Sequence, residues 1–271
     1  MEQDPRMPRP HPRRARTDAN PVRNATSGSH RSWPRIAFIS AGLLSAALTL
    51  AAQAPAPPPV PQPAPAPTPP RFVVVLDAAH GGDDPGGRLG DQVEKTFTLA
   101  LSVRLRSLLG ARGIQVITTR ETDTALDANR RAEVANHANA QACLSLHASE
   151  TGSGVHLFAS SLAPAAPTRL PAWKTAQAAW ITRSLALAGV VNSALHNAGL
   201  TVTLGRTALP VVDSMACPAV ALEIAPTRGP GNAITAGLDD PAYQARIAEA
   251  LAAAMLEWKT GTEWKTEARQ P

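Results

Sequence analysis

Four side chains that can bind a metal ion or carry a proton lie beside apolar segments of the chain. His80 follows the run FVVVL, His147 follows CLSL, Glu223 ends AVALE, and Glu94 precedes the next periodic segment after His80. Two imidazoles and a carboxylate are the ligand set of a hydrolytic zinc site that keeps its fourth position open. A second carboxylate can accept a proton from water at such a site. A polar residue at a strand end can also have no function and simply mark the point where the chain leaves the core.

The predicted elements explain how these residues can meet. Continuous or β-branched apolar runs predict strands at Phe72–Leu76, Ile114–Thr119, Ala142–Leu146, Gly154–Ala159, Ala208–Val212 and Ala219–Ile224. Helical spacing predicts helices at Thr96–Ala111, Asp127–Ala138, Ala172–Asn197 and Pro241–Trp258, with Asp127 and Asp240 as N-caps. Alternation of this kind predicts an α/β fold, a three-layer, mainly parallel sheet with helices on both faces, in a single catalytic domain at 71–258. Parallel strands place their carboxyl ends at one edge, where ligands bind.

The first seventy residues have a different composition from the rest. Residues 1–35 carry eight arginines against three carboxylates and predict a basic, disordered cytoplasmic tail. Residues 36–52 are seventeen positions without a charge, typical of either a signal sequence or a transmembrane anchor. Residues 53–70 contain ten prolines and predict a semi-rigid linker. We therefore expect the domain to be exported to the periplasmic or cell-envelope face and anchored to the membrane if 36–52 is uncleaved. Residues 259–271 are expected to be a disordered tail.

The distribution of charge and the two cysteines limit the classes of partner and metal site that the chain can have. The net charge of +5 equals the excess of the first 35 residues, so the foldable part is neutral and does not indicate a nucleic-acid partner. No protein partner is evident either. Cys143 and Cys217 lack the spacing of a zinc finger. They either form a disulfide in an exported chain or remain two buried free thiols.

The motifs, taken together, resemble the family of zinc-dependent N-acetylmuramoyl-L-alanine amidases. The matching segments, in chain order, are Leu76–Gly82 on D-P-G-H-G-G, Glu94-Lys95 on E-K, Thr119-Arg120, Ala128–Ser149 with Arg131, Asn136, Ser145 and His147, Pro218–Glu223 on P-A-V-L-V-E, and Tyr243-Gln244. The resemblance covers about residues 72–258. The chain departs from the family at Ala78-Ala79, at Ser149 and after Glu223, and none of these departures removes a proposed ligand.

The resemblance implies a function and a site. His80, Glu94 and His147 would bind one Zn²⁺, with a water at the open position, and Glu223 would accept the proton of that water and pass it to the departing amine. The bond cut would be the amide between N-acetylmuramic acid and L-alanine in peptidoglycan. Arg120 and Arg131 would either bind substrate carboxylates or serve a structural role.

Two other functions remain open from the sequence. One is a zinc peptidase or amidase that acts on another substrate, because a metal site does not identify the bond that is cut. The other is a non-catalytic wall-binding module on a membrane stalk. The intact set of four residues argues against a binding module, because binding alone does not need a base beside a metal.

Overall fold

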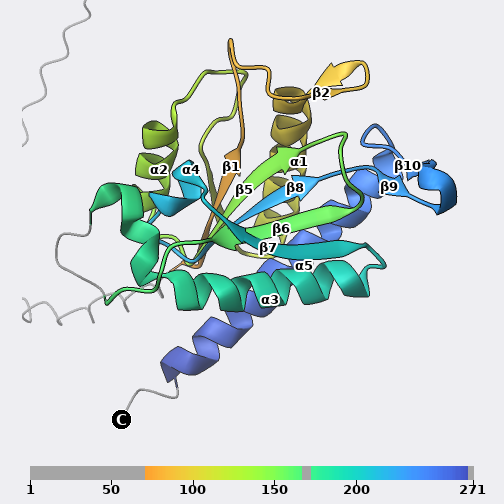
Figure 1. Ribbon diagram of the computed structural model, residues 1–271. Helices are drawn as coiled ribbons and strands as arrows, with labels where there is room; N and C mark the ends of the chain where they lie inside the picture. The colour runs from red at the N-terminus through yellow and green to blue at the C-terminus, as the bar shows by residue number, and fades with distance from the viewer. Residues whose placement is uncertain (1–70, 167–171, 268–271) are drawn as a thin grey trace, which may run out of the picture. The chain divides into compact units, whose positions relative to one another are not determined.

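The computed structural model describes residues 71–166 and 172–267 (Figure 1). The predicted basic tail, apolar segment and proline-rich linker lie outside these residues. Within them, no single helix is long and apolar enough to cross a membrane. One pair of helices bent by 69°, Trp173–Ala179 with Ile181–Asn197, meets the length and composition criteria only when taken together.

A six-stranded sheet forms the centre of the fold (Figure 1). Its order is β4 (Gln115–Thr118), β1 (Val73–Ala78), β5 (Ala142–Ala148), β8 (Ala219–Ile224), β6 (Val155–Ser160) and β7 (Val202–Thr207). All neighbouring strands are parallel except β6 and β8, which are antiparallel. The predicted mainly parallel sheet is therefore confirmed. Its apolar strands β1, β5 and β8 are central because both of their faces are buried.

Helices cover both faces of the sheet. One core cluster joins the sheet to α1 (Glu94–Ala111), α3 (Ile181–Asn197) and α5 (Pro241–Glu267). A second, smaller cluster on the other face joins it to α2 (Ala128–His137) and to the region of α4 (Pro210–Asp213), beside the 3-10 helix η1 (Trp173–Ala179). Two small hairpins complete the fold, β2 (Arg88–Leu89) with β3 (Gln92–Val93), and β9 (Thr227–Arg228) with β10 (Ile234–Ala236), the latter pair joined through the 3-10 helix η2 (Pro230–Asn232).

The predicted helix starts follow from capping chemistry. The Asp127 carboxylate accepts a hydrogen bond from the Arg130 amide at 2.8 Å, and Asp240 accepts one from the Ala242 amide at 2.8 Å. Both aspartates therefore satisfy amide groups that have no partner inside their helix. The two predicted N-caps are confirmed.

The structure differs from the sequence prediction at the edge of the sheet. The segment predicted as a strand at Ala208–Val212 forms the short helix α4, because Pro210 occupies its first turn and Asp213 accepts from the Leu209 amide at 3.0 Å. The edge strand is instead β7. Most of its side chains are exposed or half-buried, so it lacks the apolar run that marks the central strands.

The last helix is longer than predicted. Helix α5 extends past Trp258 to Glu267, into the segment expected to be a disordered tail. The Trp258 indole is still packed on the core and donates a hydrogen bond to the Gln141 carbonyl at 2.8 Å. The helix therefore remains fixed to the domain at the point where its end was predicted.

Cys143 and Cys217 form a disulfide, which decides between the two states left open by the sequence. The bond links the start of β5 to the segment before β8, across 74 positions of sequence, and both cysteines are fully buried. It thus joins the two strands that carry His147 and Glu223. In the chain-entropy model, closing a loop of this length stabilises the fold by about 4 kcal/mol.

Candidate metal centre

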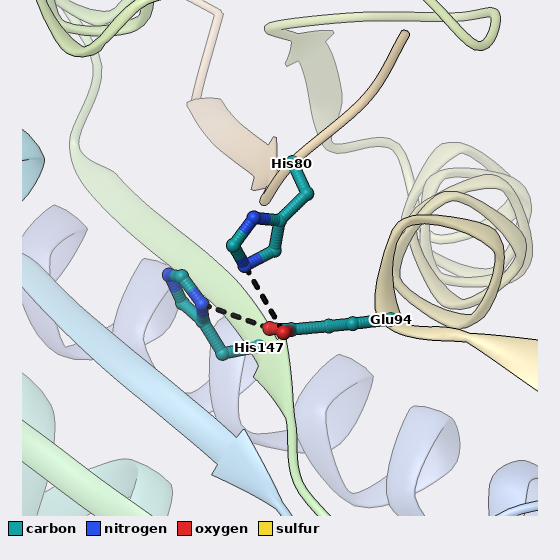
Figure 2. Close-up of side chains that lie close together, drawn as sticks. All are labelled: His80, Glu94 and His147. Carbon is teal, nitrogen blue, oxygen red and sulfur yellow. Dashed lines mark hydrogen bonds and ion pairs between the residues drawn. The ribbon is translucent and has the colours of Figure 1, made fainter. Parts of the chain in front are cut away.

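His80, Glu94 and His147 converge from three different elements (Figure 2). His80 follows β1, Glu94 is the first residue of α1, and His147 lies near the end of β5. One ligand atom from each residue lies within 4.8 Å of the other two. The Glu94 carboxylate contacts both rings, at 3.0 Å from His80 Nε2 and 3.0 Å from His147 Nδ1. The rings meet edge to face with centroids 5.5 Å apart.

The electrostatics of Glu94 suit a cation. The side chain is buried, which disfavours its charged form, but hydrogen bonds from His147 and from the Gly87 and Ala148 amides outweigh this effect. Together they lower the pKa of Glu94 below its ordinary value. An ionised carboxylate between two imidazoles is a donor set that fits a divalent metal ion, and the three residues could hold one.

The His80 ring is oriented by Asp84. The Asp84 Oδ2 atom lies 2.8 Å from His80 Nδ1, and its Oδ1 atom accepts from the Gly86 amide at 3.0 Å. The hydrogen bond with His80 lowers the pKa of Asp84. A carboxylate that accepts from one imidazole nitrogen leaves the other free to coordinate a metal. The Asp84 side chain is otherwise largely exposed.

Gly86 allows the hairpin to approach the ligands. Its φ is +67°, in the left-handed region, and a Cβ atom there would lie 2.6 Å from His80 Cδ2 and 2.7 Å from Glu94 Oε2. Both neighbours belong to the proposed metal ligands. A side chain at this position would therefore displace the groups that must converge.

Replacing Gly86 by alanine is expected to damage the metal site more than the fold. The left-handed backbone costs about 1–2 kcal/mol with a Cβ. The methyl group also pushes His80 and Glu94 apart, so we expect the affinity for a divalent metal ion, with Zn²⁺ as the probe, to fall by about 10- to 100-fold, as for other changes that misplace ligands. The zinc dissociation constant, measured by competition with a metal indicator, and the unfolding temperature check both effects.

The matched control is Gly110→Ala. Gly110 lies in α1, and nothing lies within 4 Å of a Cβ built there. Because alanine favours a helix over glycine by about 1 kcal/mol, this variant is expected to be slightly more stable with unchanged zinc affinity. Equal zinc affinity in Gly86→Ala and the wild type would show that Gly86 does not shape the site.

Glu223 stands beside the cluster without joining it. It pairs with His147 across β5 and β8, and residues paired in this way point to the same face of the sheet about 4.8 Å apart. Its side chain is half-buried and lines the same cavity as Glu94 and His147. Within the described part of the chain, its carboxylate has no hydrogen bond or ion pair. Two residues after Glu223, the Ala225 carbonyl accepts a hydrogen bond from the buried Tyr243 hydroxyl at 2.7 Å, which anchors the end of β8, and burial raises the pKa of Tyr243 to about 12.

Arg120 and Arg131 are buried beneath the site. The Arg120 guanidinium donates to the Ala78 and Ala79 carbonyls at 2.9 and 3.0 Å. Arg131 donates to the His80 carbonyl at 2.6 Å and the Ala78 carbonyl at 2.7 Å, and its Nη1 pairs with Asp77 at 2.8 Å. Both arginines thereby fix the backbone that presents His80. This geometry favours the structural role over contact with a substrate.

Asp77 completes this buried support. Its carboxylate accepts from Thr119 and Ser145 as well as from Arg131, each at 2.8 Å. Asp77 is almost fully buried, and these hydrogen bonds compensate for the removal of its carboxylate from water. The residues that sequence motifs placed near the site thus act mainly by holding the loop before His80.

The site opens into a cavity of about 320 Å³. Its walls are the candidate metal ligands Glu94 and His147, the residue Glu223, the hairpin residues Gly87 and Arg88, and the loop 148–151 after β5. Sequence reasoning did not identify Arg88 or Glu150 as part of the site. No pattern pointed to them, because the hairpin and the loop meet only in the folded chain.

An α/β domain that gathers two histidines and a glutamate beside a further glutamate has the fold and donor set of a metal-dependent hydrolase. Comparison with family models is more specific. Residues 74–257 match the model described as N-acetylmuramoyl-L-alanine amidase, and the chain belongs to this family. The resemblance inferred from the motifs is confirmed.

Relatives and solved structures agree with this assignment. The chain is 35% identical over 89 residues to the germination-specific N-acetylmuramoyl-L-alanine amidase of Bacillus subtilis, covering 28% of this chain and 38% of that protein. It is 42% identical over 78 residues to N-acetylmuramoyl-L-alanine amidase AmiA of Escherichia coli, covering 28% and 27%. The matched segments thus span well under half of these relatives. The catalytic domain of CwlV from Bacillus (Paenibacillus) polymyxa var. colistinus superposes with a TM-score of 0.54 at 27% identity, covering 70% of this chain and 98% of that one.

Proposed function

We propose that this chain is a zinc-dependent hydrolase that cuts the amide bond between N-acetylmuramic acid and L-alanine in peptidoglycan. The observation that carries the proposal is the convergence of His80, Glu94 and His147, with Glu223 beside His147 and without a hydrogen bond or ion pair among the described residues. Membership of the amidase family and the similarity to two amidases support the choice of bond.

The roles of the residues follow from their positions. His80, Glu94 and His147 would hold the ion, and Asp84 keeps the coordinating nitrogen of His80 free. When bound, zinc supplies Lewis acidity, which polarises a carbonyl and makes water more acidic. Glu223, which lacks a competing partner in the described chain, accepts a proton from the attacking water and donates it to the departing amine. Arg120 and Arg131 hold the His80 backbone in place.

The place of action follows from separate features. The Cys143–Cys217 disulfide supports an oxidising compartment, since disulfides persist mainly outside the cytosol. The uncharged segment 36–52 supports export, with the domain anchored at the membrane if this segment is retained. We therefore propose action on the periplasmic or cell-envelope face.

Digestion of purified peptidoglycan tests the function. The zinc-loaded full-length chain is expected to release stem peptides that carry a new L-alanine amino terminus, and a chelator is expected to stop the release until zinc is restored. New amino termini at another residue would identify a peptidase. Binding to the wall without any release would identify a wall-binding module.

A further inference from the structure

The cavity beside the candidate metal centre contains a positive side chain that forms no ion pair with the described residues. Arg88 is the only arginine or lysine among the described residues that line it. Its side chain is exposed, and among the described residues it donates one hydrogen bond, to the Gly90 carbonyl, which is long at 3.3 Å. Within residues 71–166 and 172–267, its guanidinium forms no ion pair. Most of its five N–H donors are thus available to a ligand.

The backbone of Arg88 is fixed relative to the metal ligands. The Gly87 amide donates to Glu94 Oε2 at 2.9 Å, and the Glu94 amide donates to the Gly87 carbonyl at 2.8 Å. The hairpin that carries Arg88 is closed by its pairing with Val93. Gly87, the residue before Arg88, therefore contacts Glu94 directly. This contact keeps the Arg88 side chain within reach of a substrate whose reacting bond lies at the candidate metal centre.

The charge indicates which part of a substrate lies here. The other charged residues that line the cavity are Glu94, Glu150 and Glu223, and Glu94 would be neutralised by the ion that it holds. Apart from that ion, which the reacting bond would occupy, Arg88 is the positive group among the described lining residues that can attract a ligand carboxylate. On the glycan side of the scissile bond, the lactyl carboxyl is consumed in the amide and is uncharged. On the peptide side, stem peptides carry free carboxylates. Where the second residue is linked through its side-chain carboxyl, its α-carboxylate is the nearest of these to the bond.

We infer that Arg88 binds the free α-carboxylate of the second stem residue and makes the enzyme selective for stem peptides that retain this charge. The inference rests on the proposed function. Guanidinium and carboxylate groups form paired, charge-assisted hydrogen bonds, which give geometric selectivity as well as affinity. An amidated stem, with a neutral carboxamide in place of the carboxylate, cannot form this pair.

Two matched substrates test the inference with the full-length, zinc-loaded chain. They are N-acetylmuramoyl peptides that differ only in a free or an amidated α-carboxyl group at the second residue. The wild type is expected to prefer the free acid. Arg88→Gln is expected to lose about tenfold or more in kcat/KM on the free acid, mainly through KM, and to change by less than about twofold on the amidated substrate. Arg88→Lys is expected to retain part of the preference.

Controls separate recognition from structure. Arg106 is also an exposed arginine and lies on α1, twelve positions after Glu94 and hence about 18 Å along the helix. Arg106→Gln is expected to act on both substrates like the wild type. Zinc content should equal that of the wild type in every variant.

Three results would contradict the inference. An equal loss on both substrates in Arg88→Gln would assign Arg88 to the fold of the hairpin. A wild type that cleaves the free-acid and the amidated substrate equally well would show that the enzyme does not select for this charge. A zinc-loaded wild type that cleaves neither substrate would contradict the proposed function, and this inference with it.

Discussion

Glu223→Gln is expected to reduce peptidoglycan hydrolysis by about 10²- to 10⁴-fold, the usual contribution of a positioned acid–base group. The substitution keeps the size of the side chain but removes its basicity. Because Glu223 has no hydrogen bond or ion pair within the described chain, and lies outside the cluster of three ligands, zinc content and unfolding temperature should stay as in the wild type. Initial rates of stem-peptide release, beside zinc analysis of the same samples, measure the effect.

Glu133→Gln provides the control for Glu223→Gln. Glu133 is an exposed carboxylate on α2 that pairs with Arg130 at 2.8 Å. Its replacement should leave the rate unchanged, since exposed ion pairs contribute little. A wild-type rate in Glu223→Gln would remove Glu223 from the mechanism and leave the proton transfer to another group.

His147→Ala is expected to lose zinc and activity together. His147 supplies one of the three donor atoms and also a hydrogen bond that helps to keep Glu94 ionised. Two remaining ligands are too few for the usual three-ligand hydrolytic site. We therefore expect less than one tenth of the wild-type zinc content after dialysis, and no measurable release of stem peptide, with the fold retained by circular dichroism.

His196→Ala is the matched control for His147→Ala. His196 is exposed near the end of α3 and belongs to no cluster of metal-binding groups in the described residues. It should retain full zinc content and activity. If His147→Ala bound zinc as tightly as His196→Ala, the ion would have to lie elsewhere.

The sequence was most informative where burial leaves a simple pattern. Strands β1, β5 and β8 are apolar on both faces, so their runs were recognisable, and the polar residues at their ends marked the site. The edge strand β7 has exposed or half-buried side chains on both faces and no such run, and it was missed. The segment PVV has strand-like composition, but Pro210 starts a helix there.

The supporting residues of the site were harder to predict for a physical reason. Arg120 and Arg131 reach the backbone carbonyls of residues 78–80, which lie 41 to 53 positions away, and a sequence does not show which carbonyls a guanidinium will face. Their motif positions indicated importance without distinguishing support from substrate binding. The contact of Asp84 with His80 depends on the turn around two glycines, which composition alone does not define.

The most direct test of the central claim is zinc K-edge X-ray absorption of the full-length chain loaded with one equivalent of zinc. We predict a first shell of two imidazole nitrogens and oxygen donors at about 2.0–2.2 Å, without sulfur. The His147→Ala chain should lose one imidazole from this shell or fail to bind the ion. A wild-type shell with sulfur, or with fewer than two imidazoles, would contradict a centre formed by His80, Glu94 and His147.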